Sequence, residues 1–291
     1  MIQAGPHPRP RLFEVTIRDV IPETADTVTL GFDALGELPP YRAGQFLSIN
    51  PHQFKGLAAH LSFLEQLKGR REPVRAYSVA SAPHEPLAIT IKEDLFVPNE
   101  SRHAPVLSPY LVFSSSVGMR LQVMGFSGRY VLPPEIEERA DHLLHVVAGS
   151  GVVPNWSILK DSLRAHPALR HVFVYANKTW EDVIYRDALN ALAAAHPDRI
   201  RLVHTLTRQA DFTGLPAEVR RGRIDSGMLA DVMPDPARTL AYVCGPAIPP
   251  WARRAALEAG LPTQPRFLES TLGFLKELGF SPDRVTRESW G

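Results

Sequence analysis

The sequence predicts a two-domain protein, with an N-terminal antiparallel β-barrel over residues 1–135 and an α/β domain with a parallel sheet over residues 136–291. Three observations predict this fold class. The chain has 291 residues, a length that suits two domains of ordinary size. Up to about residue 132 short strand-like runs follow one another, and from about residue 140 strand-like and helix-like runs alternate. The segment between them, PPEIEERAD, is short, polar and proline-bearing, as is typical of a domain boundary.

Six runs predict the strands of the barrel, because they are short, β-like and separated by turn residues. A helix from roughly Pro105 to Ser114 interrupts the barrel before its last strand. In chain order the runs are RLFEVTIRDV, DTVTLGFD, GQFLSINP, VRAYSVAS, PLAITIKE and MRLQVMGFSGRYVL.

The segment over residues 52–73 does not fit a barrel strand. Leu57, Leu61, Leu64 and Lys68 fall at helical spacing, and the segment closes with the basic run KGRRE. We therefore expect an inserted amphipathic helix. It would either simply pack its leucines on the barrel or serve as a functional lid.

The second half of the chain alternates strand-like and helix-like runs. Such an alternation is typical of βαβ units around a parallel sheet. The sequence contains no internal repeat. The runs are HLLHVVAG, VPNWSILKDSL, RHVFVYAN, YRDALNALAAAH, IRLVHTLT and TLAYVCG.

Composition excludes several classes of protein. Lysine and arginine number 32 against 31 aspartates and glutamates, with no long basic run, which argues against nucleic acid as a partner. No apolar run is long enough to span a bilayer and none resembles a signal peptide, so we expect a soluble cytoplasmic protein. The single cysteine, Cys244, excludes an internal disulfide and a cluster held by several cysteines of this chain. The histidines lack metal-ligand spacing, so no metal is predicted and redox chemistry would need an organic cofactor.

The run RAYS places a guanidinium, a phenol ring and a hydroxyl within four residues. In a strand, Arg75 and Tyr77 share one face and Ser78 lies on the other. A flat anionic ligand would explain all three groups. The alternative is a strand whose arginine and tyrosine merely cover the barrel.

The run GSGVVP, residues 149–154, lies between a predicted strand and a predicted helix. In this context glycines let the backbone approach a pyrophosphate at a helix N-terminus. Pro154 stands at the last position of the dinucleotide fingerprint, and a tight turn without a ligand would use the same residues. Both interpretations remain open from these residues.

Cys244, Gly245 and Pro246 end the last strand of the α/β half. Ligands of open α/β sheets bind outside the carboxyl ends of the strands, so a cysteine there can contact a cofactor. The alternative is a small buried apolar side chain.

The three runs in this order resemble the ferredoxin-NADP reductase superfamily, over nearly the whole chain from about Pro10 to Trp290. The chain looks closest to the flavin reductase modules of aromatic-ring oxygenase systems, through YANKTWEDVIYRDAL, RLVHTLTR and GRID. The resemblance implies an FAD-binding barrel followed by an NAD(P)-binding domain. It also implies hydride transfer from the nicotinamide to FAD and release of single electrons to an acceptor.

The resemblance assigns roles in FAD binding to two segments. Arg75 would pair with the FAD pyrophosphate, Tyr77 would pack on the isoalloxazine, and Ser78 would bond near flavin N5. In the second segment Ala104 and Pro105 stand where the family has a glycine, and proline lacks a backbone donor. The residues that match this second segment are Ile91, Lys92, Val106, Leu107 and Ser108.

For the nicotinamide half, the resemblance assigns the pyrophosphate turn to Gly149, Gly151 and Pro154, and the ring contact to Cys244 beside Gly245 and Pro246. Asn177 and Lys178 match the place where the family distinguishes the 2′-phosphate, and an ammonium there favours NADPH over NADH. Further candidates are Thr207, Arg208 and Arg223.

The chain ends ESWG, which is similar to the family's terminal Glu-x-aromatic. Glu288 and Trp290 would thus lie against the flavin, and Ser78, Cys244 and Glu288 are the expected catalytic residues.

Many members of the family carry a fused ferredoxin domain, for which this chain has neither the cysteines nor the length. The expected acceptor is therefore a separate small redox protein, a ferredoxin or an oxygenase component, and the basic end of the 52–73 segment could dock it. Two alternatives stay open: a reductase of diffusible acceptors such as free flavin or quinone, and a non-enzymatic flavin-binding electron-transfer subunit. The sequence does not indicate the oligomeric state.

Overall fold

The computed structural model describes residues 11–96 and 103–289. Its contacts divide the chain into two compact units. Unit 1 comprises Met1–Pro22 with Asp26–Val131, and unit 2 comprises Glu23–Ala25 with Leu132–Gly291.

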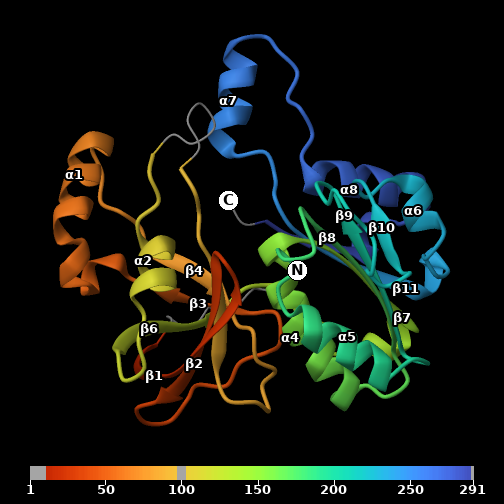
Figure 1. Cartoon of the computed structure of the whole chain (residues 1–291), viewed down its shortest axis with the longest axis horizontal. Helices are drawn as coiled ribbons and strands as arrows, with labels where there is room; N and C mark the ends of the chain where they lie inside the picture. The colour runs from red at the N-terminus through yellow and green to blue at the C-terminus, as the bar shows by residue number, and fades with distance from the viewer. Residues whose placement is uncertain (1–10, 97–102, 290–291) are drawn as a thin grey trace, which may run out of the picture. The chain divides into compact units, whose positions relative to one another are not determined.

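Unit 1 contains a six-stranded antiparallel sheet in the order β4-β3-β6-β1-β2-β5 (Figure 1). An isolated bridge between Val79 and Ile89 connects its two edges, and the Ala80 N–H donates to the Ala88 carbonyl. The sheet therefore curls into a barrel, which confirms the predicted class. Its strands are β1 (Leu12–Thr24), β2 (Thr27–Ala34), β3 (Phe46–Ile49), β4 (Arg75–Ser78), β5 (Ala88–Lys92) and β6 (Arg120–Ser127).

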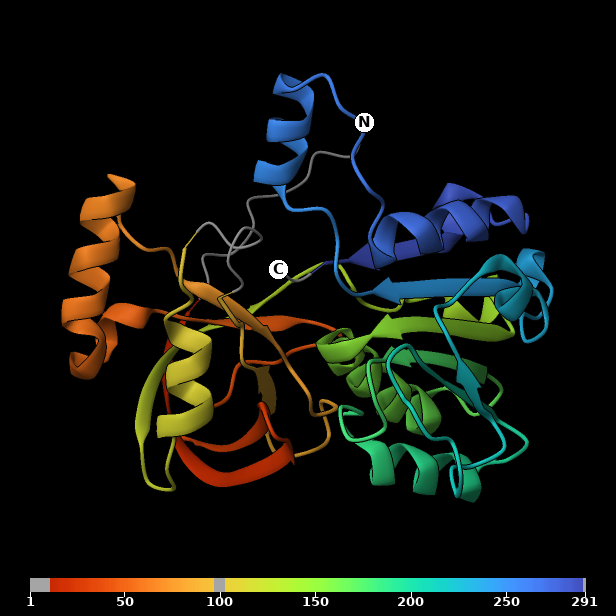
Figure 2. The same cartoon turned by 45° about the horizontal axis from the view of Figure 1, so that its top comes forward.

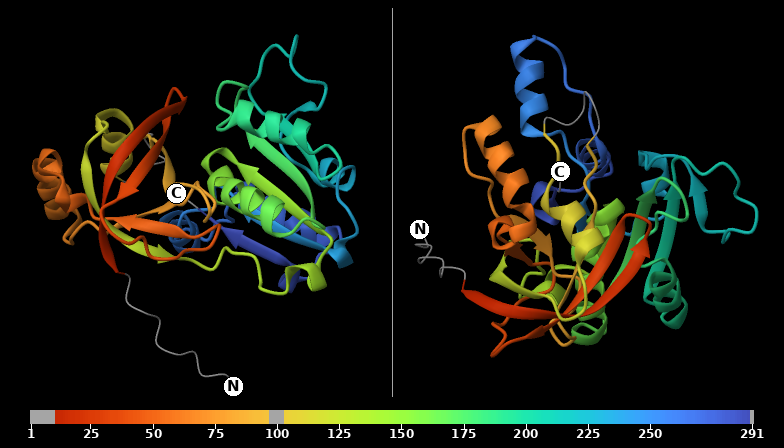
Figure 3. Two further views of the ribbon diagram at one scale, coloured as in Figure 1. Left: turned by 90° about the horizontal axis from the view of Figure 1, so that it is seen from below. Right: turned by 60° about the vertical axis from the view of Figure 1, so that its left-hand side comes forward.

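Two helices accompany the barrel. Helix α2 (Leu107–Ser114) lies between β5 and β6, two residues later than its predicted start. Helix α1 (Ala58–Lys68, orange in Figure 3) follows two short 3₁₀ helices, Pro51–Gln53 and Lys55–Leu57. The predicted leucines of the inserted segment are buried, Leu57 at the end of the second 3₁₀ helix and Leu61 and Leu64 in α1, so the segment packs through them as expected.

Unit 2 contains a six-stranded parallel sheet in the order β10-β9-β8-β7-β11-β12. The alternating second half of the chain forms the predicted βαβ units, whereas β10, β12 and helices α3, α6, α7 and α8 were not predicted. The strands are β7 (His142–Ala148), β8 (Arg170–Asn177), β9 (Ile200–Leu206), β10 (Val219–Arg221), β11 (Thr239–Cys244) and β12 (Val285–Glu288). The helices are α3 (Ile136–Arg139), α4 (Val152–Ala165), α5 (Arg186–Ala195), α6 (Ser226–Ala230), α7 (Pro250–Glu258) and α8 (Phe267–Glu277).

The two faces of the parallel sheet differ in chemistry. Figures 1 and 2 show α4 and α5 on one face and α6 and α8 on the other. The α6–α8 face is aliphatic, with Val146 and Val174 packed against Leu275. The α4–α5 face carries buried rings, among them His145, which stacks on Phe173 at 4.9 Å between ring centroids. Buried polar rings need hydrogen-bond partners, so this second face holds an internal polar network.

Candidate functional site

The RAYS run forms β4, an edge strand of the unit 1 sheet. In its register with β3, Tyr77 lies opposite Leu47 and Ser78 lies opposite Phe46. Arg75 and Tyr77 therefore share one face of the strand, and Ser78 lies on the other.

Arg75 is held by a buried carboxylate. Its Nη2 donates to Oε2 of Glu72 at 2.8 Å, and Nζ of Lys68 donates to Oε1 of Glu72 at 2.5 Å. Glu72 is only 6% exposed, whereas the Arg75 side chain is 47% exposed. Burial works against ionisation of Glu72, but the bond and charge of Lys68 and the charge of Arg75 lower its pKa. The guanidinium is thus anchored at one nitrogen and keeps other donors for an anion. Glu72 was not predicted.

Tyr77 is half-buried and Ser78 is buried. The Tyr77 ring packs against the core of unit 1. Burial raises the pKa of Tyr77 well above its usual range, and the nearby Asp94 carboxylate adds to this effect. Among the described residues, Oγ of Ser78 is buried and has no hydrogen-bond partner. An orphaned buried hydroxyl indicates a missing partner, such as a ligand atom.

In the second predicted segment, from β5 to α2, the side chains of Ile91, Lys92 and Ser108 pack against or bond to other residues of the protein. Ile91 belongs to the core and Lys92 pairs with Asp26. The hydroxyl of Ser108 donates to Oδ2 of Asp94 at 3.0 Å and accepts from the Asp94 N–H at 3.2 Å. These three residues therefore offer a ligand their backbone rather than their side chains.

Helix α2 begins without a side-chain cap. Val106 is its N-cap residue and makes no side-chain cap hydrogen bond, and Leu107 is buried. The first N–H groups of a helix lack intrahelical acceptors, so this end can still meet a phosphate despite Pro105.

In unit 2 the glycine turn and the CGP run lie against each other. A Cβ on Gly151 would lie 2.2 Å from the Cys244 carbonyl oxygen, and one on Gly245 would lie 2.5 Å from the Phe267 ring. Gly149 has a φ of 52°, which glycine adopts without strain. Two of the sequence motifs thus meet at the carboxyl ends of β7 and β11, and only glycine permits that approach. Pro154 is buried in the first turn of α4, and the Pro246 carbonyl accepts from the Leu268 N–H of α8.

Cys244 and Glu288 are neighbours across β11 and β12, where their Cα atoms form a register pair. Cys244 is fully buried. Oε2 of Glu288 is buried without a hydrogen-bond partner among the described residues, and burial raises the pKa of Glu288 to about 7. Trp290 lies outside the described residues.

The predicted phosphate-discriminating residues follow three neighbouring strands. The Thr207 N–H donates to the Asn177 carbonyl at 3.0 Å, and the Arg208 N–H donates to the Lys178 carbonyl at 2.7 Å. Asn177 is buried and its Nδ2 has no partner within the described ranges. The exposed members are Lys178, Thr207, Arg208 and Arg223.

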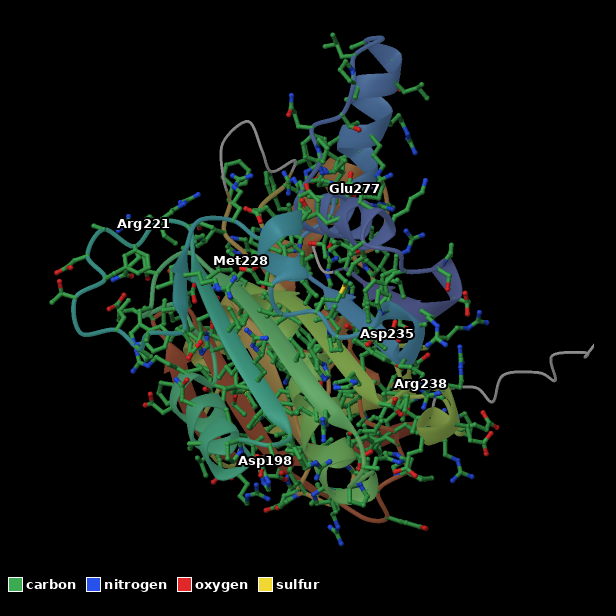
Figure 4. The ribbon with its side chains drawn as sticks, turned by 90° about the vertical axis from the view of Figure 1, so that its right-hand side faces the viewer. Asp198, Arg221, Met228, Asp235, Arg238 and Glu277 are labelled. Carbon is green, nitrogen blue, oxygen red and sulfur yellow. The ribbon has the colours of Figure 1, made fainter. Side chains whose placement is uncertain are left out.

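Figure 4 shows the end of the parallel sheet at which these residues lie. Arg221, the last residue of β10, lies at the edge opposite to Asp198, which precedes β9. The cationic side chains therefore lie at the carboxyl ends of the strands, where α/β sheets bind ligands. A surface groove lies at the opposite, amino-terminal edge, lined by His142, Asp198 and Met233 among others, and we assign no ligand to it.

Metal-ligand clusters and membrane-spanning helices are both absent from the described residues. Within 11–96 and 103–289, no group of three or more His, Cys, Asp or Glu side chains is arranged to hold a metal ion. No helix in the described part of the chain has the length and apolar character needed to cross a membrane.

Comparison with known proteins agrees with this geometry. Residues 146–249 match the family described as oxidoreductase NAD-binding domain. The ferredoxin reductase component of 3-ketosteroid-9-alpha-monooxygenase from Mycobacterium tuberculosis is 31% identical over 262 residues, covering 85% of this chain and 62% of that protein. One component of the 1,2-phenylacetyl-CoA epoxidase of Escherichia coli is 27% identical, covering 88% and 66%. The chain thus spans a little under two thirds of the length of the M. tuberculosis relative.

Among solved structures, the ferredoxin NADP⁺ reductase of Neisseria gonorrhoeae with bound FAD and NADP has a TM-score of 0.67 at 20% identity, covering 96% of this chain and 98% of that one. The cytochrome P450 reductase GcoB of Amycolatopsis has a TM-score of 0.69 at 22% identity, covering 99% and 73%. The chain therefore shares the two-domain fold of these reductase structures, and its residues 146–249 match the oxidoreductase NAD-binding family.

Proposed function

We propose that this chain is an FAD-dependent NAD(P)H oxidoreductase that passes electrons from a nicotinamide cofactor through FAD to a separate protein acceptor. The observation that carries the proposal is the hydroxyl of Ser78, which is buried without a partner among the described residues, directly after Tyr77 and near the half-exposed Arg75. A flavin dinucleotide supplies a flat ring system, a hydrogen-bonding ring edge and a pyrophosphate, which match these three groups.

The FAD-binding domain would span residues 1–135, and FAD would be held mainly by β4. Arg75 binds the pyrophosphate with the donors that Glu72 leaves available, Tyr77 lies against the ring, and Ser78 bonds near N5. The backbone from Ile91 to Ser108 completes the site through the uncapped start of α2. Bound FAD would accept a hydride and release electrons one at a time.

The NAD(P)-binding domain would span residues 136–291, with the dinucleotide at the carboxyl ends of its strands. The Gly149–Gly151 turn receives the pyrophosphate, and Cys244 and Glu288 line the hydride path. The exposed cations Lys178, Arg208 and Arg223 would bind a 2′-phosphate and favour NADPH over NADH. The match of residues 146–249 to an NAD-binding family supports this half of the proposal.

The acceptor would be a small acidic redox protein, such as a ferredoxin or an oxygenase component. The outer side of α1 supports this proposal. Phe63 and Leu67 are 64% and 61% exposed one helical turn apart, and the exposed Arg70 and Arg71 follow them. An apolar pair with a basic margin suits a partner that is negatively charged around an apolar contact. The M. tuberculosis and E. coli relatives, whose names place them in a monooxygenase and an epoxidase, support the same class of acceptor.

Substitution of Ser78 tests the proposal. We expect Ser78→Ala to keep its fold and to slow reduction of bound FAD by NAD(P)H about tenfold or more, because a bond to the reacting ring edge is lost. Ser62→Ala, at an exposed position of α1, is the matched control. A Ser78→Ala protein that binds FAD and is reduced at the wild-type rate would refute the role of this hydroxyl.

A further inference from the structure

Four buried side chains of unit 2 form a continuous chain of hydrogen bonds that ends at the glycine turn. Nδ1 of His145 lies 2.8 Å from Oδ1 of Asn155, and Nε2 of His145 lies 3.2 Å from Nδ1 of His171. Nε2 of His171 lies 3.3 Å from Oγ of Ser162. At the other end, Nδ2 of Asn155 donates to the Gly151 carbonyl at 3.3 Å. All four residues are at most 1% exposed.

The direction of every bond in this chain follows from its last acceptor and from the neutral state of both rings. A carbonyl oxygen can only accept, so Nδ2 of Asn155 faces Gly151 and Oδ1 of Asn155 faces His145. Nδ1 of His145 must then carry a hydrogen. Burial lowers the pKa of His145 to about 4 and that of His171 well below its usual value, so each ring carries one hydrogen. Nε2 of His145 therefore accepts from the Nδ1–H of His171, and Nε2 of His171 accepts from the Ser162 hydroxyl.

A second buried donor holds the same turn. The Tyr175 hydroxyl donates to the Gly149 carbonyl at 3.1 Å and accepts from the Ile184 N–H at 3.2 Å. The Gly149 C=O and the Ser150 N–H belong to the same planar peptide group and point in opposite directions. The bond from Tyr175 to the Gly149 carbonyl therefore also sets the direction of the Ser150 N–H. Two carbonyls of the turn are thus held by side chains from α4 and β8.

We propose that the chain Ser162–His171–His145–Asn155 is a positioning device for the nucleotide turn. It orients the Asn155 amide, and this amide holds the Gly151 carbonyl so that the turn is already shaped for a dinucleotide pyrophosphate. The inference rests on the proposed function, since it takes the turn to be the NAD(P) pyrophosphate site. A turn that is ordered before binding loses little conformational freedom on binding, so the device contributes to affinity.

Asn155→Asp tests the device with almost no change of shape. The introduced carboxylate still accepts from His145 but has no hydrogen to donate to Gly151. At pH 8 we expect NAD⁺ and NADP⁺ to bind about five- to tenfold more weakly by isothermal titration calorimetry. The KM for the reduced nucleotide should rise by a similar factor, while kcat stays within about twofold.

Asn190→Asp is the matched control, because Nδ2 of Asn190 donates to the Arg186 carbonyl at 2.9 Å in the same i to i−4 geometry on α5. It removes the same kind of bond in the same unit and should leave nucleotide affinity unchanged. An equal loss in both variants would overturn the proposal, as would wild-type affinity in Asn155→Asp.

A pH profile separates positioning from a general loss of stability. Protonation of the introduced carboxyl group restores an O–H donor for Gly151, so the affinity deficit should shrink between pH 8 and pH 6. His145 contacts the substituted position, and His171 and Tyr242 contact His145. Tyr175 bonds to Gly149 of the turn and the Cys244 backbone lies against Gly151, while the charges of His142, His166 and Arg199 act on His171. A deficit that is the same at both pH values would contradict the assigned donor role.

The wild-type protein gives a measurement that needs no variant. Imidazole nitrogen NMR should find His145 and His171 both neutral and both in the Nδ1–H tautomer at pH 7. The Nε2–H tautomer at either ring would break the bond directions and overturn the proposal. If the wild type binds neither NAD⁺ nor NADP⁺ while the tautomers are as expected, the proposed function fails and the geometry of the device stands.

Discussion

Arg75 is the residue whose surroundings point most directly to an anion. Glu72 holds one guanidinium nitrogen, and nearly half of the side chain stays exposed. We expect Arg75→Ala to weaken FAD binding about 10- to 100-fold, because a charge-assisted bond contributes about 1.5–3 kcal/mol. Fluorescence titration of the protein with FAD measures the change. Arg120→Ala, which removes an exposed arginine of β6, should bind FAD as the wild type does. An unchanged FAD affinity in Arg75→Ala would remove the arginine from the site.

Lys178 is the residue that we propose to set the preference between the two nicotinamide cofactors. It is exposed beside Arg208 at the carboxyl end of the sheet. Lys178→Ala should raise the KM for NADPH about tenfold and leave the KM for NADH nearly unchanged, because only NADPH carries the 2′-phosphate. Steady-state kinetics with each cofactor measure the two KM values, and Lys276→Ala is the control for loss of an exposed lysine. Equal changes for NADPH and NADH would mean that Lys178 does not discriminate.

At the scale of secondary-structure elements, the α4–α5 face of the parallel sheet makes unit 2 sensitive to acid. Burial lowers the pKa of His145 and His204 to about 4 and that of His171 further. Between pH 6.5 and 4 the unfolded chain therefore binds more protons than the folded one, and stability falls as pH falls. Glu288, with a pKa raised to about 7, acts in the opposite direction, but one carboxyl offsets only part of three histidines. Thermal unfolding followed from pH 7 to pH 4.5 should show a falling transition temperature for unit 2, and a flat profile would contradict the burial of these rings.

His204, on the same face, has no hydrogen-bond partner among the described residues. Both of its ring nitrogens are buried and unpaired within the described part of the chain, between the Tyr175 and Trp180 rings. His204→Phe should raise the free energy of unfolding by about 1–2 kcal/mol at pH 7, and by more at pH 5, because an unsatisfied polar ring is removed. Chemical denaturation at the two pH values measures both differences. A less stable variant would mean that the ring nitrogens are hydrogen-bonded in solution.

Helix α1 is the helix inserted between strands β3 and β4 of the barrel. Reversing the charges of Arg70 and Arg71 to glutamate should slow reduction of an acidic protein acceptor severalfold at low salt, with a smaller effect at high salt. Reduction of FAD by NAD(P)H should not change. Reversal of Arg164 and Arg170, two exposed arginines of unit 2, alters the net charge equally and is the control. Equal acceptor rates for both reversed proteins would leave α1 as a packing element only.

At the scale of the whole molecule, the sequence predicts the fold class and the motifs but not their supporting residues. Local patterns of apolar residues predict the barrel, the parallel sheet and the α1 helix. Glycines beside a strand end mark the GSG and CGP runs as candidate ligand-binding turns. Glu72, Asp94 and Asn155 act only through contacts with residues brought close by folding, and no local pattern marks them. Strand β12 was missed because its four residues, VTRE, of which three are half-exposed and one is exposed, give no clear alternation. Alternation in HLLHVV puts His142 and His145 on opposite faces of the strand, and only the structure pairs His145 with His171.

Reduction of the flavin by a nicotinamide cofactor is the decisive measurement for the proposed electron path. The purified protein, loaded with FAD and kept free of oxygen, is mixed rapidly with NADPH or with NADH while the visible flavin absorbance is followed. We expect noncovalently bound FAD whose absorbance is lost with both cofactors, faster with NADPH. A protein that does not bind FAD, or FAD-loaded protein that neither cofactor reduces, would contradict the proposed function.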